Sequence, residues 1–216
     1  MLPLSLGWKA IILNRKTKPC LVACSVLKKE ITKLIENDEL DAEVVFISQL
    51  FHEDLNRLEK NLRLTIEQTL QHNNRNVILV YGDFCLGLQG QMKKIVDEFK
   101  IIKIDALNCV DCLLGGKGKY LEVDPNQELI FLSQGMMNVF KHLKRLMKKE
   151  GFNEEDMSKI FKNAKGIVAL DSLGNYSRLI EEINKQDTGL KILRTINVGC
   201  ENVRQVIQES IEKIKK

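Results

Sequence analysis

Short apolar runs alternate with amphipathic segments along the chain, and this alternation sets the expected fold. Runs rich in β-branched residues predict strands, and apolar residues at helical spacing predict the helices between them. Strands are expected at 8–13, 21–23, 43–47, 77–81, 101–104, 129–132, 166–170 and 191–193. Helices are expected behind a Ser25 cap and at 54–70, 92–99, 136–147, 154–162, 176–184 and 202–214. This order is typical of βα units around a mostly parallel sheet.

Two features refine the expected arrangement. The run 77–81 is the most apolar and is placed at the centre of the sheet, because a strand buried on both faces loses its alternation. The turn sequence Asp124-Pro125-Asn126 lies within 120–127 and marks a boundary between two lobes. The sequence therefore predicts a Rossmann-like, doubly wound α/β fold. It is read as one domain over 1–216, with a division into two similar lobes near 120–127 as the alternative.

Composition excludes several classes of protein. The chain has 216 residues, of which 44% are apolar and 29% charged, with a net charge of +4. No apolar stretch is long enough to span a bilayer, and the small net charge does not suggest a nucleic-acid-binding protein. The N-terminus lacks the basic start and the cleavage site of a secretion signal. We therefore expect a cytoplasmic protein whose six cysteines are thiols or metal ligands rather than disulfides.

Soft ligands follow four successive predicted strands. Cys24 comes directly after 21–23, His52 shortly after 43–47, and Cys85 after 77–81, while Cys109 and Cys112 lie beyond 101–104. Because the carboxyl ends of parallel strands share one edge of a sheet, these side chains are expected to meet there. We call Cys24, His52, Cys85, Cys109 and Cys112 the rim cluster. Cys112 is its additional candidate, and Cys20 and Cys200 are left without a role.

Thiolate and imidazole ligands together favour a soft metal. Zinc is the first expectation, and an iron–sulfur cluster or corrinoid cobalt are alternatives. Gly82 and Gly87 would let the backbone approach a cofactor closely, and Asp83 and Asp111 would support the ligands from behind. These four residues are the candidate cofactor-binding positions.

Other interpretations compete with a metal site. Unreactive cysteines are commonly buried, so the chain could instead be a non-catalytic interaction protein whose basic helix at 141–149 docks on an acidic partner. Alternatively, Cys85 or Cys109 could be an enzyme nucleophile. The Cys109-x-x-Cys112 spacing fits a dithiol redox motif poorly, because Gly115 and Gly116 stop the helix early. No standard phosphate-binding loop is present.

Two polar residues outside the rim cluster also have alternative roles. Asp171 follows the strand 166–170 and could orient a ligand or cap the helix that begins near Asn175. His72 lies in a polar stretch and is expected in an exposed loop.

Several segments resemble a known family. They are Leu21–Ile31, Leu50–Glu53, Tyr81–Gly87, Asn108–Gly115, Phe131–Gly135 and Ile167–Ser172, which together resemble the domain-of-unknown-function family DUF1638. The family pattern runs A-C-G, then a histidine, then Y-G-x-C-G, then a cysteine before L-L-G. This chain departs from it with Ser25 after the first cysteine and with Phe84 inserted before Cys85.

The resemblance implies a context that residue spacing does not supply. Members of the family occur in methanogens and other anaerobes, often encoded beside corrinoid-dependent methyltransferases. It therefore implies an accessory role in one-carbon methyl transfer, with a corrinoid protein or a methyltransferase as partner. The positions that match the family's motif are Cys24, His52, Cys85 and Cys109.

Overall fold

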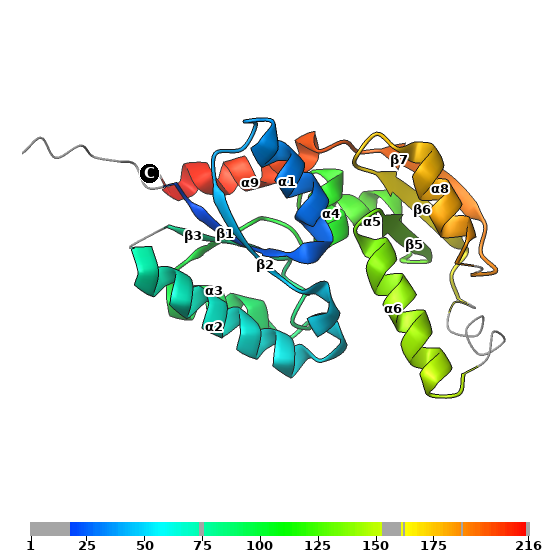
Figure 1. The fold of residues 1–216 in the computed structure, drawn as a ribbon, viewed down its shortest axis with the longest axis horizontal. Coiled ribbons are helices and arrows are strands. Elements are labelled where there is room, and N and C mark those ends of the chain that lie inside the picture. The colour runs from blue at the N-terminus through cyan, green and yellow to red at the C-terminus, as the bar shows by residue number, and fades with distance from the viewer. Residues whose placement is uncertain (1–17, 74–75, 153–160, 162, 187, 215–216) are drawn as a thin grey trace, which may run out of the picture.

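The computed structural model describes residues 18–73, 76–152, 161, 163–186 and 188–214 (Figure 1). It confirms an α/β fold built on parallel strands, which form two sheets rather than one. The expected strand at 8–13 and, apart from Phe161, the expected helix at 154–162 lie outside the described residues.

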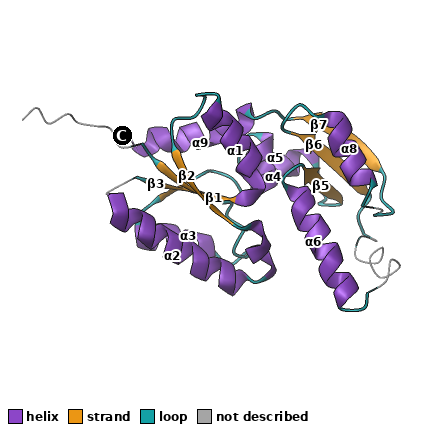
Figure 2. Cartoon of the chain, in the orientation of Figure 1, coloured by secondary structure: helices purple, strands orange, loops and turns teal. Residues whose placement is uncertain are grey.

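The first sheet carries most of the rim cluster. Its strand order is β2-β1-β3-β4 and every neighbouring pair is parallel. The two central strands are buried along their whole length, which confirms the central position predicted for 77–81. Figure 2 shows helices on both sides of this sheet, with α2 and α3 below it and α1 and α9 above it. The strands are β1 (Cys20–Cys24), β2 (Glu43–Ile47), β3 (Val77–Val80) and β4 (Ile102–Lys103).

The predicted helices of the first half are present, with two corrections, and the structure adds two short helices after β4 that were not predicted. Ser25 does not cap a helix, because the chain makes a 3₁₀ turn before α1 and the Ser25 hydroxyl instead accepts a hydrogen bond from Gln49 N at 2.9 Å. His72 lies in the last turn of α2 rather than in a loop. The segments are η1 (Ser25–Leu27), α1 (Lys28–Glu36), η2 (Gln49–Glu53), α2 (Leu55–Asn73), α3 (Gln91–Phe99), α4 (Cys109–Leu114) and α5 (Lys119–Val123).

The second sheet has the sequential order β5-β6-β7 and is also parallel. Helices α6 and α8 pack against it, whereas α9 returns to contact α1, α4, β3 and β4 of the first half. The lobe boundary near 120–127 therefore stays a prediction: this segment lies between the two sheets, but the last helix crosses back. The elements are β5 (Leu129–Ser133), α6 (Met136–Lys149), β6 (Gly166–Asp171), α8 (Tyr176–Asn184), β7 (Ile192–Asn197) and α9 (Glu201–Ile214).

The two sheets meet through the loops at their carboxyl ends. Gly135, two residues after β5, packs so closely on the turn after β1 that a Cβ there would lie 1.8 Å from Val26 O. Beside this contact, the buried Ser172 hydroxyl after β6 donates to Glu30 Oε1 of α1 at 2.5 Å. The residues that follow parallel strands in both halves therefore share one interior region.

Gly135→Ala tests this close approach. The φ of Gly135 is −73°, which any residue adopts, so the only cost is the clash with the Val26 carbonyl. We expect a loss of about 3 kcal/mol in the free energy of unfolding, measured by urea denaturation. Gly174→Ala is the control: it has open space around it but a φ of +73°, and should cost about 1 kcal/mol. Equal losses in the two variants would contradict tight packing at Gly135.

Candidate functional site

Cys24 and Cys85 lie where the strand order of the first sheet reverses. Cys24 is the last residue of β1, and Cys85 follows the adjacent β3. Ligands of open α/β sheets bind at such a reversal, outside the carboxyl ends of the strands. Tyr81 is buried and interacts electrostatically with both cysteines. Its hydroxyl finds no hydrogen-bond partner of good geometry among the described residues.

The loop that carries Cys85 is joined by its backbone to the loop that carries Cys109. Asp83 N donates to Ala106 O at 3.0 Å, and Phe84 N donates to Leu107 O at 2.9 Å. This pairing requires a glycine at position 82, because a Cβ there would lie 2.3 Å from Leu107 O. Gly82 therefore serves the approach of one loop to the other, which brings the two cysteines to the same edge.

Cys109 and Cys112 share a short helix. Asn108 caps α4, its Oδ1 accepting a hydrogen bond from Asp111 N at 2.9 Å. The helix ends after six residues at Gly115, whose φ is +103°, as its glycines predict. A spacing of three residues places both thiols on one face of α4. Cys112 is fully buried, and Cys109 is partly exposed.

His52 is oriented by the backbone of η2. Its Nδ1 lies 3.0 Å from Gln49 O, and its ring stacks on Tyr81 with a centroid distance of 6.2 Å. If Nδ1 carries the proton, as the carbonyl requires, the lone pair is on Nε2. No described residue forms a hydrogen bond or ion pair with Nε2. Burial also lowers the pKa of His52, which favours the neutral imidazole. A metal-ligating histidine has this arrangement.

The thiols of the rim cluster are protonated at neutral pH. Burial raises the pKa of Cys24 and of Cys112 to about 12 and that of Cys85 to about 11. Burial raises the pKa of Cys109 further, and its charge would also be repelled by the thiolates of Cys85, Cys24 and Cys112. A pKa of about 11 leaves roughly one Cys85 in ten thousand ionised at pH 7. This disfavours Cys85 or Cys109 as a nucleophile in the metal-free protein.

The side chains do not close around a metal as they stand. Within the described ranges, no three Cys, His, Asp or Glu side chains come close enough together to hold an ion. The kinds of donor do fit a soft metal, since thiols and a neutral imidazole gather at one edge of the sheet. A shared ion would require cysteine side chains to change rotamer.

The candidate cofactor-binding residues build the loops of this edge. The carboxylate of Asp111 accepts hydrogen bonds from the backbone N–H groups of Leu107, Gly118 and Tyr120, and so holds the segment between α4 and α5. Burial opposes ionisation of Asp83, but ion pairs with Lys103 at 3.0 Å and Lys117 at 3.1 Å outweigh it and lower its pKa. Gly87, with a φ of +97°, ends the turn that carries Cys85.

The strand ends of the second sheet supply further polar groups, of which the sequence indicated only Asp171. Gln134 Nε2 donates to Asp171 Oδ1 at 2.8 Å, and this oxygen also accepts from Asn175 N before α8. Asp171 therefore holds the turn before α8 but does not cap that helix, whose N-cap is Asn175 without a side-chain hydrogen bond. Its other expected role, orienting a ligand, stays a prediction. Cys200 Sγ donates to Ser172 O at 3.2 Å.

Glu30 is the residue that sequence reasoning missed. It is fully buried, its Oε2 has no hydrogen-bond partner in the described structure, and burial raises its pKa. The sequence signal that could have identified Glu30 is its position four residues from both Val26 and Leu34, which places a charged residue on the apolar face of α1. Its charge would also raise the pKa of Cys112, so Glu30 lies within electrostatic reach of the rim cluster.

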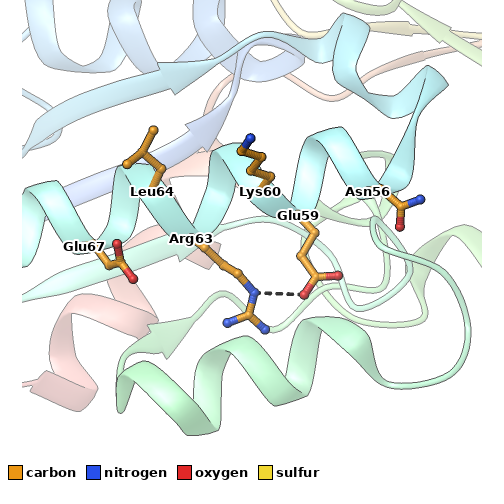
Figure 3. A pocket seen from close by; sticks show the side chains of 6 residues that line it. All are labelled: Asn56, Glu59, Lys60, Arg63, Leu64 and Glu67. Carbon is orange, nitrogen blue, oxygen red and sulfur yellow. Dashed lines mark hydrogen bonds and ion pairs between the residues drawn. The ribbon is translucent and has the colours of Figure 1, made fainter.

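A hollow on the solvent side of α2 is lined by two cations, Lys60 and Arg63, and by two carboxylates, Glu59 and Glu67. Figure 3 shows Arg63 within it, bonded to Glu59 at 2.9 Å. Arg63 also pairs with Glu98 of α3 at 2.7 Å. The lining of the hollow therefore carries as many negative as positive side chains, and we assign it no function.

Comparison with known proteins adds the family. The family model described as "Protein of unknown function (DUF1638)" matches residues 46–215. The chain belongs to this family. Of the rim cluster, only Cys24 lies outside the matched segment. Neither the search of curated proteins nor that of solved structures found a match. None of the described helices combines the length and apolar character that a membrane span needs.

Glu30→Gln should change how stability depends on pH. The pKa of Glu30 is raised from 4.5 in the folded protein, so between the unfolded and folded values the folded state holds a proton that the unfolded state has released. Stability conferred by the neutral carboxyl is therefore lost as pH rises above about 4.5. Glutamine keeps an oxygen that accepts the Ser172 hydrogen bond but does not titrate. The free energy of unfolding, measured by urea denaturation between pH 5 and 8, should therefore change less with pH in the variant than in the wild type. An unchanged slope would contradict the burial of a neutral Glu30.

The thiols should label slowly in the metal-free native protein. With pKa values of about 11 to 12, the alkylation rates of Cys24, Cys85 and Cys112 should rise about tenfold per pH unit from pH 7 to 10. Site-resolved mass spectrometry measures these rates. In urea-unfolded protein the rates should level off near pH 9 instead. If the alkylation rates of the native protein also level off near pH 9, the thiols are not buried as described.

Proposed function

We propose that this DUF1638 protein binds a soft metal ion or metallocofactor through Cys24, His52, Cys85 and Cys109, with Cys112 within reach. The observation that carries the proposal is the gathering of electrostatically coupled thiols at the same sheet edge as an imidazole whose Nδ1 lies 3.0 Å from Gln49 O. Zinc is the first candidate, because three thiolates and one imidazole match its tetrahedral preference. An iron–sulfur cluster or corrinoid cobalt are the alternatives.

The electrostatics of the cluster support a cation. Burial is the main cause of the raised thiol pKa values, and a bound metal would offset that burial cost by deprotonating the thiols outright. Three thiolates would exceed the charge of a divalent ion by one. Lys103, held by Asp83 and Ala106 O, offsets part of the burial-driven rise in the pKa of Cys85 and Cys112 and would supply compensating positive charge.

The chain's own residues would position the ligands. The carbonyl of Gln49 keeps the Nε2 lone pair of His52 free, and the paired loops around Gly82 hold Cys85 beside Cys109. Asp111 fixes the segment that follows α4. An accessory role in corrinoid-dependent methyl transfer, with a corrinoid protein or methyltransferase as partner, rests on the family resemblance alone.

A second candidate is an interaction protein whose cysteines only fill the core. The absence of three converging donors in the described ranges favours it, as does the full burial of Cys112. The basic helix at 141–149, its expected docking surface, has fewer cations available for an acidic partner, because Lys141 pairs with Glu182 and Lys144 donates to Gln186 O.

Elemental analysis of anaerobically purified protein tests the metal proposal. We expect close to one metal per chain for a mononuclear site, and at least a fivefold lower content in Cys85→Ser and Cys109→Ser, because each removes a thiolate ligand. Cys200→Ser is the matched control, since Cys200 bonds to Ser172 O outside the cluster and serine retains that hydrogen bond. Metal-free wild-type protein with a cooperative unfolding transition would overturn the proposal in favour of the interaction protein.

A further inference from the structure

A cleft of about 500 Å³ lies between the carboxyl ends of β1 and β2 and the side of α6. Figure 1 shows η2, which follows β2, beside α6, and the two elements are in contact. The first wall consists of Ser25, Ser48, Gln49 and Leu50, and the second of Asn138, Lys141, His142 and Arg145. The first wall follows strands of one sheet, while the second belongs to a helix that packs on the other sheet.

The α6 wall presents cationic and polar side chains on one helical face. Positions 138, 141, 142 and 145 have the i, i+3, i+4, i+7 spacing that aligns side chains along a helix. His142 Nε2 lies 2.7 Å from Glu53 Oε1, which ties this face to η2 across the cleft. Arg145 Nη2 lies 3.3 Å from His142 Nδ1.

Arg145 lacks a counter-charge in the described part of the chain. Lys141 has one in Glu182 at 3.3 Å, but Glu182 also pairs with Arg178 at 3.2 Å. Glu53 is engaged by His142. The acidic groups around the cleft are therefore occupied, and the guanidinium of Arg145 is not paired with any of them. An anionic ligand would supply the missing charge.

The opposite wall adds neutral donors. The Ser48 hydroxyl oxygen accepts a hydrogen bond from Leu50 N at 3.3 Å, and the Ser25 hydroxyl oxygen accepts one from Gln49 N at 2.9 Å. An oxygen that accepts from the backbone still has a hydrogen to donate. Ser25 also lies 3.4 Å from Gln49 Oε1, a long contact that a better acceptor could replace.

We propose that this cleft binds a small molecule through a compact oxyanion, a phosphate or a carboxylate. Arg145 and Lys141 supply the charge, and Ser25, Ser48 and Asn138 supply neutral donors. The hollow of about 290 Å³ beside Asp83 is a weaker candidate, because two of its three lysines, Lys103 and Lys117, are already paired with that carboxylate.

The cleft adjoins the proposed metal site. Gln49 lines it, and the carbonyl of the same residue orients His52, while Ser25 directly follows Cys24. A ligand anchored on Arg145 would therefore lie beside the rim cluster. That the ligand is a substrate of the metal site rests on the proposed function, whereas its binding to the cleft does not.

Isothermal titration calorimetry of the full chain tests the binding, with inorganic phosphate and acetate as separate probes at constant ionic strength. Saturable binding of at least one probe is expected, and the probe that binds more tightly identifies the anionic group. Arg145→Gln should weaken that binding at least tenfold, and Lys141→Gln severalfold, because each removes a cation from the cleft.

Lys149→Gln is the matched control, because it removes the same charge from an exposed position of α6 outside the cleft. The affinity of this variant for the probe should equal that of the wild type. The proposal is overturned if neither probe binds saturably, or if Lys149→Gln weakens binding as much as Arg145→Gln does. Titrations of chelator-treated protein keep this outcome separate from the metal proposal, whose own test is the metal content.

Discussion

The hydrogen bond between the buried Ser172 hydroxyl and Glu30 joins the two sheets at the ends where their functional loops emerge. Around it, Gln134 bonds to Asp171, and Gly135 packs against the Val26 carbonyl. These contacts set α6 against η2 and thereby shape the cleft that contains Arg145. They also cover the carboxyl end of the first sheet, where the rim cluster lies. Both proposed sites therefore depend on how the carboxyl ends of the two sheets meet.

Enclosure has a chemical consequence for the thiols. Excluding water from Cys24, Cys85, Cys109 and Cys112 raises their pKa values, so the protein holds neutral thiols instead of repelling thiolates. Neutral thiols are poor nucleophiles, but a metal that displaces their protons would be held strongly in the same low-dielectric surroundings. One physical cause therefore argues against covalent catalysis by the metal-free protein and in favour of an ion.

The sequence predicted those features that local patterns determine. Periodicity located the strands and placed Cys24 and Cys85 just after two of them, which the structure shows to be the neighbours β1 and β3. The division into two sheets and the role of Glu30 depend on contacts between segments more than a hundred residues apart, which no local pattern contains. Ser25 was wrongly assigned as a cap for the same reason, since its partner Gln49 lies in another loop. Likewise, the basic helix at 141–149 was considered as a docking surface for an acidic partner and not as the wall of a cleft, because no local pattern shows that α6 lies against η2.

Cobalt substitution tests the central claim most directly, namely that the thiols and His52 hold one ion together. Metal-free protein titrated anaerobically with Co(II) should develop near-ultraviolet thiolate-to-cobalt charge-transfer absorption that saturates at one equivalent. The absorption should weaken in Cys24→Ser, Cys85→Ser and Cys109→Ser, the visible ligand-field bands should shift in His52→Ala, and Cys200→Ser should match the wild type. Wild-type protein without charge-transfer absorption, or variants of the rim cluster with unchanged spectra, would contradict the account.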